Sequence, residues 1–64
     1  MQIRINKKTI LNYESLFNRL DHYDKLNTLI DYAIDHYDID ASIISDDTDF
    51  YKINDWYILE IEFK

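Results

Sequence analysis

Carboxylates are the side chains through which this chain could do most chemistry. Asp and Glu number 13, against 7 Lys and Arg. One stretch has the spacing of a calcium-binding loop, whose oxygen ligands would be Asp38, Asp40, Ser42, Asp46 and Asp49. The sixth position of such a loop requires glycine for its sharp turn, and here it is Ile43. A solvated acidic loop is therefore favoured, with calcium binding as the alternative.

Histidine is the other residue type suited to proton transfer, and the chain has His22 and His36. A general base needs a partner and a pocket that orients it. Neither histidine lies in a Ser-His-Asp or metal-hydrolase spacing. The absence of Cys and Gly excludes a thiol nucleophile, a Cys-based zinc site, a disulfide and a glycine-rich phosphate loop. We therefore expect a protein that is not an enzyme and that uses no metal or cofactor.

The aspartates also predict a charged surface. A spacing of i, i+4 and i+7 places Asp31, Asp35 and Asp38 on one helical face, where like charges destabilise a helix by a few tenths of a kcal/mol each. Lysine could have kept this face soluble without that repulsion. A surface for a basic partner and a merely solvated face both fit the pattern. The acidic residues expected to contact a partner are Asp31, Asp35, Asp38, Asp40, Asp46, Asp47 and Asp49.

The aromatic residues are many for so small a core, since there are six Tyr, three Phe and one Trp. Tyr and Trp are favoured at protein interfaces, where they bury area and still make hydrogen bonds. We expect Tyr32, Tyr51 and Trp56 to serve as anchors for a partner. Ordinary packing within the domain is the alternative for each of them.

Hydrophobic periodicity predicts the elements that position these side chains. Residues 1–5 alternate as in a strand. Apolar residues then recur at helical spacing over 10–20, with Thr9 or Asn12 as the N-cap. A second helical pattern covers 25–37, with Asp24 as its N-cap.

The second half of the chain is predicted to be mostly strand. Isoleucines raise the β-branched content of 39–44, which favours a short strand there. Segments 50–53 and 56–63 are strand-like and flank Asn54-Asp55, a pair that suits a hairpin turn. In the last segment Trp56 and Ile58 share the side opposite Tyr57, so one side is exposed or covered by a partner. The order β-α-α-β-β-β predicts an α+β domain whose antiparallel sheet has two helices on one face.

Size and composition indicate the number of domains, the source and the location of the protein. Sixty-four residues form one small domain, 1–64, which must have a dense core or form an oligomer to be stable. We expect no membrane span and no signal peptide, because no long apolar run occurs. Ile, Asn, Lys, Tyr, Phe and Met, which have AT-rich codons, make up 31 of 64 residues and indicate a low-GC bacterium, its phages or its plasmids. The expected location is the cytoplasm of the bacterial host.

The charge is unevenly distributed along the chain. Residues 1–20 carry four basic side chains and one acidic one, for a net charge of +3, whereas residues 21–64 carry three and twelve, for −9. Such an acidic chain is not expected to bind nucleic acid directly.

In size, charge and compositional style the whole chain resembles anti-CRISPR proteins and other DNA-mimic inhibitors of phages and mobile elements. This resemblance implies an acidic inhibitor that occupies the basic nucleic-acid-binding surface of a host protein, such as an RNA-guided nuclease, by DNA mimicry or by steric block. The alternative is a homodimeric accessory or regulatory protein that binds through the hairpin face around Trp56.

Overall fold

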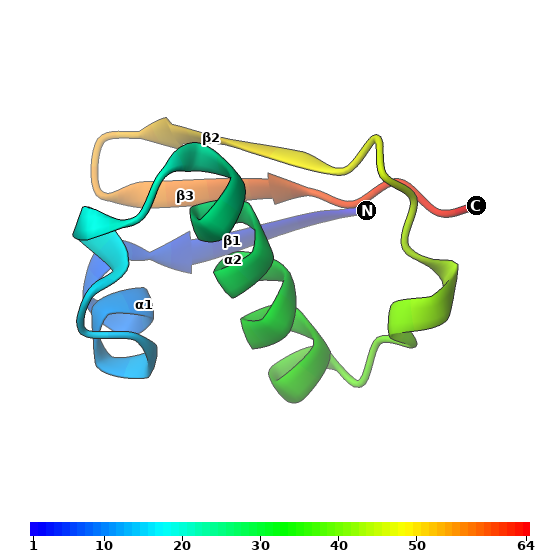
Figure 1. Cartoon of the computed structure of the whole chain (residues 1–64), viewed down its shortest axis with the longest axis horizontal. Coiled ribbons are helices and arrows are strands. Elements are labelled where there is room, and N and C mark those ends of the chain that lie inside the picture. Colours follow the sequence, from blue (N-terminus) through cyan, green and yellow to red (C-terminus); the bar gives the residue numbers. More distant parts are fainter.

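A computed structural model describes all 64 residues as an α+β domain (Figure 1). Three strands form an antiparallel sheet in the order β1-β3-β2, so the last strand lies in the centre. The predicted α+β class is confirmed. In chain order the elements are β1 (Gln2–Asn6), α1 (Lys7–Tyr13), the 3-10 helix η1 (Phe17–Arg19), α2 (His22–Tyr37), the 3-10 helix η2 (Ala41–Ile43), β2 (Asp49–Ile53) and β3 (Trp56–Glu60).

The core lies between the sheet and the helices. Figure 1 shows α1 and α2 on the same side of the three strands. The strands contribute alternate residues, such as Ile5 and Leu59, while α2 contributes Leu29 and Ala33. Phe17, from η1, is fully buried and packs edge-on against Tyr57 with 5.0 Å between ring centroids. The remaining members of this buried cluster are Ile3, Ile10 and Ile61.

The helix predicted over 10–20 is shorter and begins earlier. Asn6 caps α1 by accepting a hydrogen bond from the Lys8 amide, so neither Thr9 nor Asn12 is the cap. The helix ends at Glu14, whose backbone is extended and whose carboxylate accepts a hydrogen bond from the amide of Leu16. This break lets the chain turn and bring Phe17 into the core, which a continuous helix would not do.

The second helix begins at His22, three residues before the predicted start. Its N-cap is Asp21, whose carboxylate accepts the amide of Asp24, so Asp24 lies in the first turn and is not the cap. A negative charge in the first turn interacts favourably with the helix dipole. Asp38 ends the helix in the left-handed conformation, with φ of 53°. Asp takes the place of the glycine that usually occupies this position.

The strand predicted over 39–44 is absent. Residues 41–43 form η2, with Asp40 as its N-cap, and Ile44 makes a single isolated bridge to Phe63. The predicted hairpin is confirmed, because Asn54 adopts a φ of 54° between β2 and β3. The sheet therefore has three strands, and the last one ends at Glu60, before the predicted residue 63.

Backbone hydrogen bonds tie the segment before β2 to the end of the chain. The Ser45 amide donates to the Glu62 carbonyl at 2.8 Å, and the Lys64 amide donates to the Ile43 carbonyl at 2.9 Å. The buried Thr48 hydroxyl accepts a hydrogen bond from the Glu62 amide at 3.0 Å and donates to the Glu62 carbonyl at 3.3 Å. These bonds hold residues 43–48 in place opposite α2.

Candidate functional site

The acidic surface is formed by α2 and by the segment that leads from it to β2. Nine aspartates and one lysine lie between residues 21 and 49. All nine aspartates are exposed. We call this surface, formed by Asp21, Asp24, Asp31, Asp35, Asp38, Asp40, Asp46, Asp47 and Asp49, the aspartate surface.

The cations of the chain do little to balance the aspartate surface. Lys25, the only lysine in this stretch, lies over the ring of Phe17, with its Nζ 5.8 Å from the centroid. Arg4 and Lys52 lie over aromatic rings of the sheet, and Lys7 pairs with Asp55 at 3.8 Å. Within the aspartate surface, His22 Nε2 donates a hydrogen bond to Asp49 Oδ1 at 2.9 Å, which is an ion pair only when His22 is protonated. Most of the negative charge of the surface is therefore not balanced by cations of the chain.

The predicted contact residues Tyr32 and Asp35 lie where α2 meets α1. The Tyr13 hydroxyl donates to Asp35 Oδ2 at 2.7 Å, and its ring packs edge-on against Tyr32. His36 stacks on the ring of Tyr32, with 4.0 Å between the two ring centroids. Tyr32 is half-buried and holds the two helices together, while Asp31 and Asp35 remain exposed beside it.

Tyr13 is predicted to ionise late. The hydrogen bond to Asp35 and, after it, partial burial raise the pKa of Tyr13 from 10.0 to about 12. Because the pKa is higher in the folded state, this contribution to stability is complete below pH 10 and is lost as the pH rises toward 12.

In a spectrophotometric titration of the tyrosines, the ionisation step at the highest pH is expected to disappear in Tyr13→Phe, because Tyr13 has the raised pKa. The step should remain in Tyr37→Phe, which removes an exposed tyrosine of α2. Survival of the step in Tyr13→Phe would contradict the assignment.

The residues considered as calcium ligands do not converge on one point. Asp38 caps α2, and Asp40 accepts hydrogen bonds from the amide and the hydroxyl of Ser42, which lower the pKa of Asp40. Asp49 accepts hydrogen bonds from His22 and from the Phe50 amide, which lower the pKa of Asp49 in that order of importance. No three His, Asp or Glu side chains of the chain are grouped so that they could hold a metal ion. These carboxylates cap turns and carry charge.

The structure places Tyr51 and Trp56 on the opposite side of the molecule from α2. They alternate with Phe50 and Tyr57, which face the core, so they lie on the face of the sheet that no helix covers. We call this the open sheet face. Trp56 and Ile53 are 39% and 52% exposed, and Arg4 lies 5.3 Å over the Trp56 ring. The predicted contact residues are thus divided between two opposite surfaces.

Ile58 lies at the centre of the open sheet face and is only 4% exposed. No helix covers it, and its cross-strand neighbours are Arg4 and Tyr51. These two long side chains shield Ile58 from solvent. The face therefore presents aromatic and aliphatic surface around Ile58, with Arg4 over Trp56 and with the hydrogen-bonded pair Gln2 and Glu60 at the end of the strands.

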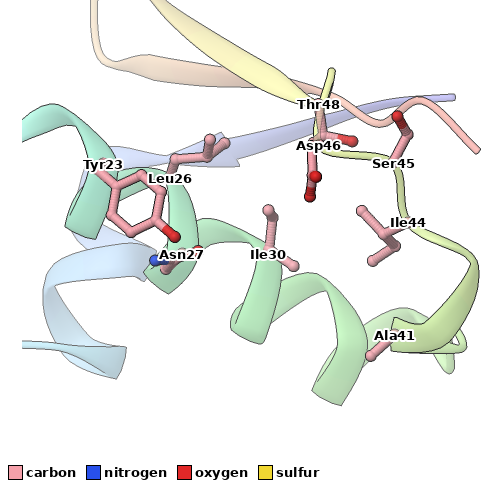
Figure 2. A pocket seen from close by; sticks show the side chains of 9 residues that line it. All are labelled: Tyr23, Leu26, Asn27, Ile30, Ala41, Ile44, Ser45, Asp46 and Thr48. Carbon is pink, nitrogen blue, oxygen red and sulfur yellow. The ribbon is translucent and has the colours of Figure 1, made fainter.

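A groove that sequence reasoning did not predict lies between α2 and residues 41–48 (Figure 2). It has a volume of about 480 Å³, which is within the usual range for ligand sites. Its walls are apolar at Leu26, Ile30 and Ile44, and Tyr23, Asn27 and Asp46 add polar groups. Only Ile30 and Leu26 belong to a recognisable apolar stripe, and no local pattern indicates that residues 41–48 lie against them.

Both histidines lie outside the groove. His22 stacks on Phe50 with 4.4 Å between ring centroids and pairs with the exposed Asp49, and His36 belongs to the contact between α1 and α2. What the groove offers chemically is one carboxylate, one amide and one phenol around an aliphatic floor. Such a set binds cations and hydrogen-bond donors.

Two further observations bear on identity. None of the helices has the length and apolar character that crossing a membrane requires. The chain matches no protein-family model, no curated protein and no solved structure.

Proposed function

We propose that this protein is an acidic inhibitor that binds the lysine- and arginine-rich nucleic-acid-binding surface of a partner protein and blocks it. RNA-guided nucleases of bacterial defence are the first target class, because they hold nucleic acid in positively charged channels. The protein acts in the cytoplasm of the bacterial host, without catalysis of its own. It blocks by DNA mimicry if it covers the residues of the target that contact nucleic acid, and by steric block if it covers residues beside them.

The observation that carries this proposal is the uncompensated charge of the aspartate surface. Nine exposed aspartates lie on α2 and the segment that follows it, and the one lysine among them is turned onto Phe17. A solvated face made only for solubility would gain from mixed charge, since like charges on a helix repel. A surface of one sign steers a partner of the opposite sign and speeds association.

The proposal is tested by competition. Purified protein is mixed with RNA-guided nucleases loaded with their guides, and target DNA binding is measured at increasing salt. We expect the protein to displace DNA from at least one nuclease and to lose affinity as salt rises, because exposed charges are screened. Failure to bind any nuclease of the panel at low salt, with no basic partner recovered from a low-GC bacterial lysate, would refute it.

A homodimer is the second candidate, and the open sheet face is the observation that favours it. Two such faces can pack against each other as in a β-sandwich and would bury Trp56, Tyr51 and Ile53. We expect sedimentation equilibrium at micromolar concentration to detect a dimer that Trp56→Glu dissociates. A strict monomer would exclude this candidate, whereas a dimer is compatible with inhibition through the aspartate surface.

A further inference from the structure

We propose that the groove between α2 and residues 41–48 receives an arginine side chain from the partner. The inference rests on the proposed function and makes it specific, because it names one contact at which a basic surface would be anchored. The groove lies within the aspartate surface, between the helix that carries Asp31 and the loop that carries Asp46 and Asp47.

Asp46 lies at the groove without a cationic partner. Figure 2 shows its carboxylate turned from the loop toward α2, above Ile30. The ion pairs of the chain join Lys7 to Asp55 and His22 to Asp49, so Asp46 has no cationic partner within the chain. No lysine, arginine or histidine lines the groove. The groove therefore presents an unbalanced negative charge to whatever enters it.

The groove combines this charge with an aliphatic floor. Leu26, Ile30 and Ile44 form apolar walls on which the methylene stem of a long cationic side chain can pack, while its charged head reaches Asp46. A small inorganic cation would make no use of these walls. The groove thus fits a cation at the end of an apolar chain.

The polar groups of the groove favour arginine over lysine. The side-chain hydrogen bonds beside the groove join Asp47 to Ser45 and Thr48 to Glu62, and none uses the polar ends of Tyr23, Asn27 or Asp46. A guanidinium has five donors in a plane, so it can pair with the Asp46 carboxylate and also donate to the Asn27 amide oxygen or lie against the Tyr23 ring. An ammonium offers a point charge and no planar surface.

The groove is also held in shape before a partner arrives. Residues 43–48 are tied to the end of the chain by the Ser45, Thr48 and Lys64 hydrogen bonds, and α2 is anchored in the core through Leu29 and Ala33. A preformed site avoids the entropic cost of ordering a loop on binding.

The test uses small probes, so that it does not depend on finding the partner. The ¹⁵N-labelled protein is titrated with Nα-acetyl-arginine methylamide, with its lysine counterpart and with the neutral citrulline counterpart, which has nearly the same shape as arginine. We expect the arginine probe to shift the amide signals of Tyr23, Asn27 and Asp46. Its affinity should be at least tenfold above that of citrulline and severalfold above that of lysine.

Two variants with the same change in charge complete the test. Asp46→Asn is expected to weaken arginine binding at least tenfold, whereas Asp47→Asn, whose residue does not line the groove, should change it less than twofold. Equal binding of citrulline, equal binding of lysine, or equal effects of the two variants would overturn the proposal. If instead the probe binds as expected and no nuclease does, the proposed function fails and the groove assignment stands.

Discussion

Reversing the charge of Asp31 and Asp47 together is expected to weaken inhibition of the target nuclease about 100-fold. Each change replaces an attraction by a repulsion at the contact, and like charges facing one another across an interface cost several kcal/mol. A 100-fold loss corresponds to about 2.7 kcal/mol. The measurement is the concentration of protein that displaces half of the bound DNA. The inhibitory concentration of the variant should also change less steeply with salt concentration.

These two aspartates are chosen because their side chains make no hydrogen bond or ion pair within the domain that lysine would disrupt. Asp35 accepts the Tyr13 hydroxyl, Asp38 caps α2 in the left-handed conformation, and Asp49 pairs with His22. Lysine at any of these three positions would change stability as well as charge.

Glu60→Lys with Glu62→Lys is the matched control for this double reversal. It changes the net charge by the same amount, from −6 to −2, at positions that alternate with the buried Leu59 and Ile61 and therefore face away from the helices. We expect this control to inhibit within about threefold of the unmodified protein, because only long-range attraction is reduced. Equal losses in both double variants would mean that net charge, and not the aspartate surface, determines binding.

Replacing Leu29 by alanine is expected to cost about 2–5 kcal/mol of unfolding free energy, as truncations of fully buried leucines do. A domain of this length has a total stability of roughly 3–10 kcal/mol, and no disulfide supports it. The variant should therefore lose a large share of the stability of the domain. Urea denaturation followed by circular dichroism measures the change as a lower midpoint.

Leu16→Ala removes the same atoms at a position that is 54% exposed, beside η1. Its unfolding free energy is expected to change by less than about 0.5 kcal/mol, as for most surface substitutions. A similar midpoint for Leu29→Ala and Leu16→Ala would show that the core described between α2 and the sheet is wrong.

Local patterns correctly predicted the elements in which apolar residues follow a single helix or strand period throughout. Strand alternation in 1–5 and 56–60, the apolar stripe of α2 and the Asn54 turn are of this kind, because side-chain period and turn chemistry act over a few residues. The helix predicted over 10–20 was wrong in its second half. Phe17 has helical spacing, but the chain leaves the helix at Glu14 and buries Phe17 from the 3-10 helix η1. The strand predicted over 39–44 was wrong, although its three isoleucines favour extended backbone. Asp40 caps a 3-10 helix there, and only Ile44 forms a β-bridge, to Phe63.

The sequence by itself determined the acidic character of this protein, its α+β class and the stretch in which its aspartates lie, since charge and hydrophobic period are properties of neighbouring residues. Only the tertiary structure decided which of these side chains act together. It turned Lys25 onto Phe17, engaged Asp35 with Tyr13, and placed Tyr51 and Trp56 on the sheet face opposite α2. The groove at Asp46 likewise exists only because hydrogen bonds to residues 62–64 hold the loop against α2, and contacts between segments so far apart leave no local pattern.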